Sequence, residues 1–107
     1  LARSLSLDPE VLLMDEPFSA LDAVTRETLQ DLLFQEISSR KIVTILVTHS
    51  IEEGAYLGNR LFLMKKSPAP PLKEFPPYSG QRNRETRILP GYFSVCSELR
   101  RAMEERT

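Results

Sequence analysis

The fold of this chain is decided by Val11-Leu12-Leu13-Met14-Asp15-Glu16-Pro17, in which four apolar residues are followed by two carboxylates and a proline. A short continuous apolar run is typical of a strand buried on both faces, and such strands occur in parallel sheets covered by helices. A second, largely apolar run extends from Ile42 to Val47 and is followed by Thr48-His49-Ser50. We therefore expect two buried strands, each with polar residues at its carboxyl end.

Helical patterns separate these runs. Asp22 or a neighbour can N-cap a helix that reaches about Ser39. Residues 51–56 predict a short helix ending near Gly58, and residues 60–64 predict a third strand. The resulting order, βαβαβ, predicts an α/β domain with a parallel sheet and right-handed crossovers.

Two apolar stripes are expected to form the helical part of the core. The stripe on the first long helix consists of Leu29, Leu32, Leu33 and Ile37. The stripe on a last helix over residues 91–106 consists of Phe93, Cys96, Leu99 and Met103. Residues 1–5 resemble the last turns of a further helix, which Asp8-Pro9 would end.

Composition excludes several classes of protein. The chain has 107 residues, a formal net charge of -1, 41% hydrophobic and 27% charged residues, which is typical of one ordinary globular domain. A polycation that coats nucleic acid is excluded. The single cysteine, Cys96, allows neither an internal disulfide nor a zinc module, so a reducing compartment is expected. No apolar run approaches the roughly 18 residues of a membrane span.

The composition changes near Ser67. Residues 1–66 carry seven basic and ten acidic residues, whereas residues 67–107 carry seven and five. Five of the eight prolines lie between Pro68 and Pro77, where they disfavour both helix and central strand. We predict a domain over residues 1–66, a proline-rich basic linker over 67–90 and a C-terminal helix over 91–107.

The polar residues at the strand ends suggest phosphate chemistry. Ligands of open α/β sheets bind beyond the carboxyl ends of the strands. Asp15 and Glu16 can face a hard cation and a water respectively, and magnesium prefers such oxygen ligands. His49 can donate a hydrogen bond to a phosphate oxygen. Taken alone, the two carboxylates also fit a solvated turn, and His49 fits a structural histidine.

Three motifs together resemble one family, the ATP-binding-cassette (ABC) ATPases, which have a P-loop NTPase fold. Residues 11–17 resemble the Walker B strand, Ser19-Ala20-Leu21-Asp22 resembles the D-loop, and Val47-Thr48-His49 resembles the switch-histidine loop. They occur in the family's order. Leu1-Ala2-Arg3-Ser4-Leu5 resembles the end of the helix that follows the family's signature motif.

Two further segments resemble the cassettes of nitrate, sulfonate, taurine and bicarbonate importers. They are Leu21-Asp22-Ala23-Val24-Thr25-Arg26 and Ile51-Glu52-Glu53-Gly54-Ala55-Tyr56-Leu57-Gly58-Asn59-Arg60. The resemblance implies an ATPase subunit of a bacterial importer for such small anions, lying peripherally on the cytoplasmic face of the inner membrane. The implied partners are a second cassette, a transmembrane permease and, indirectly, an extracytoplasmic solute-binding protein. Nucleic acid is not an implied partner.

The resemblance also implies roles for individual residues. Asp15 would hold Mg²⁺, and Glu16 would polarise the water that attacks the γ-phosphate of ATP. His49 would contact that phosphate. Ser19 and Asp22 would lie where ATP is sandwiched between two cassettes. Ser19 stands where many relatives have glycine, and Ser50 where aspartate is common.

The phosphate loop Gly-x-x-x-x-Gly-Lys-Ser/Thr and the signature motif are absent from these 107 residues. The loop's amides and lysine cradle the triphosphate, so we expect the chain alone to hydrolyse no ATP. The start at Leu1-Ala2-Arg3, without methionine, suggests a piece of a longer polypeptide. Two alternatives stay open: a non-transport cassette ATPase acting on DNA or ribosomes, and a truncated, inactive cassette that serves as an interaction module.

The C-terminal part carries its own alternatives. Pro68-Ala69-Pro70-Pro71 has the form of a PxxP ligand, although a linker is favoured. Arg82, Arg84 and Arg87 could meet nucleic acid or anionic lipid, although a solvated basic segment is favoured. A substrate-sensing role of residues 67–107 is a further hypothesis.

Overall fold

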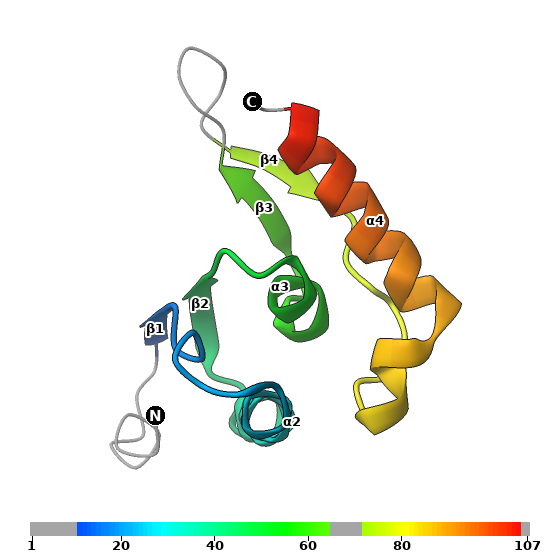
Figure 1. Cartoon of the computed structure of the whole chain (residues 1–107). Helices are drawn as coiled ribbons and strands as arrows, with labels where there is room; N and C mark the ends of the chain where they lie inside the picture. Colours follow the sequence, from blue (N-terminus) through cyan, green and yellow to red (C-terminus); the bar gives the residue numbers. More distant parts are fainter. Residues whose placement is uncertain (1–10, 65–71, 106–107) are drawn as a thin grey trace. The chain divides into compact units, whose positions relative to one another are not determined.

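The computed structural model describes residues 11–64 and 72–105 (Figure 1). The chain divides into two compact units, residues 1–49 and residues 50–107. This division lies well before the compositional change near Ser67. The predicted helix over residues 1–5 and the PxxP-like segment fall outside the described residues.

The first unit is a β-α-β arrangement. Strand β1 (Val11–Asp15) leads through helix α2 (Ala23–Arg40) to strand β2 (Val43–Val47). The two strands pair in parallel, as predicted, and the register runs from Val11 opposite Val43 to Asp15 opposite Val47. This register brings the carboxyl ends of both strands to one edge.

Helix α2 has the predicted start. Asp22 is the N-cap, and its side chain accepts the backbone N–H of Thr25. The helix ends at Lys41, which adopts the left-handed conformation with φ 55° and donates its N–H to the carbonyl of Ile37. A C-terminal residue in this conformation satisfies carbonyls that the helix leaves without partners.

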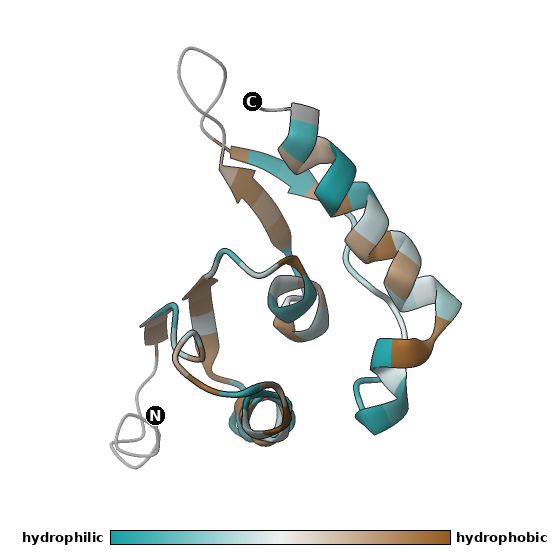
Figure 2. Ribbon diagram, viewed as in Figure 1, coloured by the Kyte–Doolittle hydropathy of each residue, from teal (hydrophilic) through white to brown (hydrophobic). Residues whose placement is uncertain are grey.

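One face of the β1–β2 sheet is buried and the other is exposed. The buried core of this unit includes Leu12, Met14, Phe18, Leu33 and Ile42. The opposite face carries exposed apolar residues, namely Val11, Leu13, Val43, Ile45 and Val47. Figure 2 shows both strands as mainly apolar. The expectation of strands buried on both faces is therefore wrong within this unit, because none of its described elements covers the second face.

The second unit contains two helices and a hairpin. Helix α3 (Ile51–Leu57) is followed by strands β3 (Leu61–Met64) and β4 (Leu72–Phe75), the 3₁₀ helix η1 (Arg84–Ile88) and helix α4 (Pro90–Glu105). Helix α4 packs on α3 and also contacts η1 and β3.

The third strand corrects the predicted topology. β3 was expected to extend the parallel sheet, but it pairs antiparallel with β4, from Leu61 opposite Phe75 to Met64 opposite Leu72. β4 and η1 also lie within residues 67–90, which composition predicted to be a linker. Prolines 76 and 77 follow β4 directly, where they need not donate to the ladder.

The prediction that Leu32 and Phe93 belong to the helical core is wrong. Leu32 is 53% exposed, whereas Leu33 is buried and Leu29 and Ile37 are half-buried. On α4, Phe93 is 55% exposed and Tyr92 takes its place beside buried Cys96 and Leu99. A spacing of three or four residues is compatible with either neighbour, so the packing partner decides which one is buried.

Candidate functional site

The site predicted from sequence lies at the carboxyl edge of β1 and β2. Asp15 stands opposite Val47, so Glu16 and Thr48 leave the two strands at the same level. The backbone N–H of Glu16 donates to the carbonyl of Val47 at 2.8 Å, which extends the strand pairing by one residue. Residues that are 33 positions apart in the sequence thereby meet at one edge.

Glu16 and His49 are in direct contact. The Glu16 carboxylate accepts the backbone N–H of His49 at 2.6 Å, and the same oxygen lies 3.6 Å from Nε2 of the imidazole. The Glu16 side chain is 28% exposed, whereas that of His49 is 93% exposed. The bond to the backbone therefore orients the carboxylate while the imidazole remains open to solvent.

The backbone of Glu16 has a conformation that side-chain-bearing residues seldom adopt. Its φ of 50° lies in the left-handed region, where a Cβ atom crowds the following carbonyl. This turn directs the chain away from the strand immediately after Asp15. Such conformations cluster at functional sites because the surrounding structure holds them in place.

Asp15 ends β1 with an exposed side chain. Its carboxylate forms no hydrogen bond or ion pair with the described residues. Carboxylate oxygen is a ligand that magnesium prefers, and magnesium commonly keeps several waters and takes substrate phosphate oxygens as well. In residues 11–64 and 72–105, no three His, Cys, Asp or Glu side chains form a group that could hold a metal by themselves. A single carboxylate beside a phosphate ligand is compatible with magnesium.

The loop that contains Ser19 and Asp22 is tied to Glu16. Fully buried Phe18 anchors it, and its carbonyl accepts the N–H of Leu21 at 3.2 Å. The Ser19 hydroxyl donates to the carbonyl of Glu16 at 3.2 Å. Ser19 stands where the family commonly has glycine. Its hydroxyl forms a local hydrogen bond that glycine could not form.

Asp22 ends this loop and begins α2. Its carboxylate accepts the N–H of Thr25 at 2.9 Å and the hydroxyl of Thr25 at 3.0 Å. These hydrogen bonds favour the charged form, with the backbone bond the larger cause, and they lower the pKa of Asp22 below its usual value. Both oxygens of the carboxylate are bonded to Thr25 in the first turn of α2, so Asp22 acts as the N-cap of this helix.

His49 is joined through Ser50 to α3. Ser50 is the N-cap of this helix, and its hydroxyl accepts the N–H of Glu53 at 3.2 Å. Aspartate is an equally good N-cap residue. The departure from the family pattern at this position therefore preserves the helix start.

The sequence did not predict the role of Arg82. Its guanidinium donates to the carbonyls of Tyr56, Gly58 and Gly80 at 2.9, 3.1 and 2.6 Å. Arg87 was also expected to be solvated, but its guanidinium lies 3.9 Å from the centre of the Tyr56 ring. The solvated-segment interpretation is therefore wrong for both arginines. The sequence around these two arginines shows no helical or strand periodicity that could have indicated these contacts.

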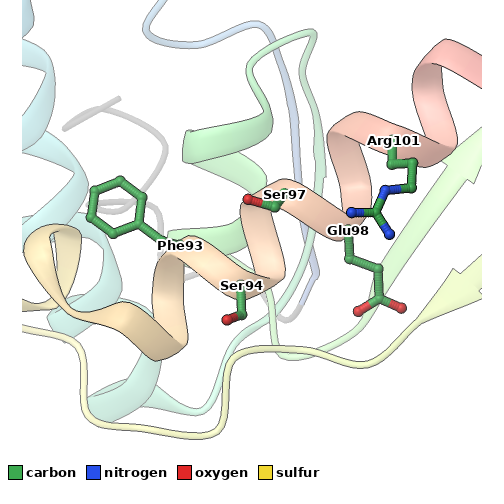
Figure 3. Close-up of a pocket in the computed structure, with 5 residues that line it drawn as sticks. All are labelled: Phe93, Ser94, Ser97, Glu98 and Arg101. Carbon is green, nitrogen blue, oxygen red and sulfur yellow. The ribbon is translucent and has the colours of Figure 1, made fainter.

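A surface hollow on α4 lies outside the predicted site (Figure 3). Its lining residues all project from this one helix; they are Phe93, Ser94, Ser97, Glu98 and Arg101. Because no second element contributes to the lining, the hollow has no opposing wall to enclose a ligand. None of the candidate site residues lies in it.

No helix within the described ranges is both long and apolar enough to cross a bilayer. No family model matches the chain.

Comparison with curated proteins places the chain among relatives of one kind. It is 49% identical over 87 residues to the aliphatic sulfonates import ATP-binding protein SsuB of Bacillus subtilis, covering 80% of this chain and 34% of the relative. It is 40% identical over 99 residues to the bicarbonate transport ATP-binding protein CmpD of Synechococcus elongatus, covering 89% and 35%. It is 46% identical over 82 residues to the taurine import ATP-binding protein TauB of Pseudomonas putida, covering 77% and 31%. The chain spans about a third of the length of these relatives.

Proposed function

We propose, from the chain's homology to the ATP-binding subunits of ABC importers, that it is the C-terminal part of a subunit that hydrolyses ATP to power uptake of a small anion. The names of the relatives support a sulfonate, taurine or bicarbonate as the transported solute, and nitrate belongs to the same chemical class. The observation that carries the proposal is the contact between Glu16 and His49 at the ends of two parallel strands.

Glu16 is proposed to polarise the attacking water. Its carboxylate is oriented by the His49 N–H and keeps partial solvent access, as a group that must meet a water requires. The exposed His49 imidazole is proposed to donate to the γ-phosphate. Phosphoryl transfer needs positioning and charge stabilisation more than covalent chemistry, and these two groups supply both.

Asp15 is proposed to hold magnesium through a water. Its exposed carboxylate at the strand end fits that role, with the remaining ligands from water and the nucleotide. Bound magnesium would neutralise part of the phosphate charge. Ser19 and Asp22 are proposed to place their loop at the interface between two cassettes. The bond of the Ser19 hydroxyl to the Glu16 carbonyl and the bond of the Thr25 N–H to the Asp22 carboxylate support this by holding the two ends of the loop.

The proposed partners follow from the same family. They are a second cassette, a transmembrane permease and, indirectly, an extracytoplasmic solute-binding protein, with the subunit on the cytoplasmic face of the inner membrane. These 107 residues contain no phosphate loop, so we propose that the chain by itself hydrolyses no ATP.

The test uses a full-length cassette that contains this sequence. Glu16→Gln is expected to retain ATP binding, to lower turnover by about a hundredfold or more, and to accumulate the ATP-bound dimer. Glu27→Gln, a change at an exposed glutamate of α2, serves as the matched control and should turn over like the wild type. Equal turnover in Glu16→Gln and the wild type would refute the role of Glu16.

A second measurement separates the importer from its alternatives. We expect the full-length cassette to co-purify with a permease and to support uptake of a sulfonate, taurine, bicarbonate or nitrate. ATPase activity that is stimulated by DNA or ribosomes, with no permease bound, would instead identify a non-transport cassette. Absence of ATP binding would identify an inactive interaction module.

A further inference from the structure

The backbone conformation of Glu16 has to be held by its surroundings. Its φ of 50° lies in the left-handed region, where a Cβ atom crowds a neighbouring carbonyl, and the following proline restricts it further. The direction of the bond from Cα to Cβ, and with it the position of the carboxylate, depends on this conformation. A rotation that relieved the crowding would therefore move the carboxylate away from the His49 N–H.

Two backbone groups of the neighbouring strand end hold part of Glu16. The Glu16 N–H donates to the carbonyl of Val47 at 2.8 Å, and the Glu16 carboxylate accepts the N–H of His49 at 2.6 Å. Neither bond fixes the peptide that follows Glu16. Pro17 has no N–H to donate in that peptide, so the orientation of the peptide depends on the donors that its carbonyl oxygen meets.

Ser19 supplies these donors. Its N–H donates to the Glu16 carbonyl at 3.5 Å and closes a four-residue turn with proline in the second position, which is a favoured position for proline in β-turns. A distance of 3.5 Å is longer than usual for such a bond, whereas the Ser19 hydroxyl donates to the same carbonyl at 3.2 Å. The hydroxyl is a side-chain group, so a substitution can remove it and leave the backbone N–H in place.

Buried Phe18 keeps Ser19 within reach of this carbonyl. The Phe18 side chain is fully buried, and its own carbonyl accepts the N–H of Leu21 at 3.2 Å, so the loop is anchored between Glu16 and the start of α2. We propose that Ser19 is a positioning residue, which holds the peptide after Glu16 and thereby keeps the carboxylate in the orientation that meets the attacking water. This proposal rests on the proposed function, and it gives Ser19 a role toward Glu16 of its own subunit.

The test compares two serines of the full-length cassette that form the same kind of local bond. Near the end of α2, the Ser39 hydroxyl donates to the carbonyl of Glu36, also three residues earlier, also at 3.2 Å and also exposed. For Ser19→Ala we expect kcat to fall about threefold to tenfold, with the KM for Mg-ATP within about twofold of the wild type. Ser39→Ala is the matched control and should keep the wild-type kcat.

A conservative variant shows whether the hydroxyl is responsible. Ser19→Thr keeps a hydroxyl and should recover most of the kcat that Ser19→Ala loses. A wild-type kcat in Ser19→Ala, or a Thr variant as slow as the Ala variant, would overturn the positioning role. An equal loss of kcat in Ser39→Ala would also overturn it, because the loss would then reflect the removal of any such bond.

The ATP-bound dimer separates positioning from a contact between cassettes. Glu16→Gln is expected to accumulate this dimer, and adding Ser19→Ala to it should leave the dimer fraction on gel filtration unchanged. A loss of dimer would show that the hydroxyl acts between the cassettes, and would overturn the positioning role. If Glu16→Gln turns over normally, the proposed function fails and this proposal fails with it. If Glu16→Gln is inactive but Ser19→Ala is fully active, this proposal alone fails.

Discussion

The backbone N–H of His49 donates to the Glu16 carboxylate at 2.6 Å, so the orientation of a candidate catalytic carboxylate depends on a main-chain group two residues after the end of β2. The bond does not use the imidazole, which remains 93% exposed. One residue can thus orient the carboxylate through its backbone and meet a phosphate through its side chain. The parallel register of β1 and β2 makes this possible, because it brings both strand ends to the same level.

This relationship predicts different stabilities for two substitutions of Glu16. Glutamine keeps an oxygen that can accept the His49 N–H, whereas alanine leaves that donor without its partner. We expect Glu16→Ala to lower the free energy of unfolding by about 1 kcal/mol more than Glu16→Gln does. Urea unfolding of the full-length cassette measures the difference. Equal values for the two variants would mean that the bond adds nothing to stability.

The end of α2 offers a stabilising substitution. Lys41 has a φ of 55° and an exposed side chain, and glycine adopts this conformation without crowding a Cβ atom. Lys41→Gly is expected to raise the free energy of unfolding by about 0.5–1 kcal/mol, whereas β-branched Lys41→Val should lower it. Thermal unfolding of the wild type and the two variants measures the order of their stabilities. A Val variant as stable as the Gly variant would contradict the left-handed conformation at this position.

Tyr92 predicts a loss of stability at high pH. Burial is the largest cause that raises the pKa of Tyr92 above its usual value near 10. Above about pH 10 the unfolded chain loses this proton while the folded chain keeps it, so the unfolded state is favoured. The contribution of Tyr92 is complete below that pH and decreases as the pH rises toward the folded-state pKa.

The measurement compares the wild type with Tyr92→Phe between pH 8 and 11. The free energy of unfolding of the wild type should fall more steeply above about pH 10, because only the wild type carries this group. Parallel curves for the wild type and Tyr92→Phe would contradict the raised pKa.

A charged substitution on the exposed face of the β1–β2 sheet is expected to have opposite effects in the 107-residue chain and in a full-length cassette. In the 107-residue chain, Leu13 is 71% exposed beside other apolar side chains, so Leu13→Lys should increase the monomer fraction on gel filtration. In a full-length cassette we expect this face to be covered, so the same change should lower the free energy of unfolding by roughly 2 kcal/mol or more.

Val24→Lys is the matched control for this pair of experiments. Val24 is 74% exposed on α2, away from the sheet, and its substitution should change little in either context. Higher stability of Leu13→Lys in the full-length cassette would show that the face is not covered there.

Local patterns were sufficient for the elements around the candidate site. The apolar runs predicted β1 and β2, and Asp22 and Gly58 marked the start of α2 and the end of α3. Hydrophobic periodicity and capping act within a few residues, so one sequence contains the necessary information. The motif resemblance identified Asp15, Glu16 and His49 as candidates. The expectation of parallel strands placed Glu16 and His49 at the same edge, where they are in contact.

The contacts of the C-terminal part could not be predicted in the same way. Arg82 and Arg87 were interpreted as part of a solvated basic segment, because most of their partners lie more than 20 positions earlier in the chain. These distant partners are the carbonyls of Tyr56 and Gly58 and the ring of Tyr56. The prolines suggested a linker, yet β4 ends directly before two of them. A proline outside the hydrogen-bonded ladder is compatible with a strand, and composition does not record that position.

The sequence alone therefore determined where the strands and helices of this protein begin and end near the site, because apolar spacing, caps and glycines act locally. Tertiary structure decided that β3 pairs with β4, that one face of the first sheet is exposed, and that Tyr92 rather than Phe93 enters the core. It also decided that Arg82 binds the end of α3. These features depend on contacts between residues distant in the chain, and such contacts form only when the elements pack.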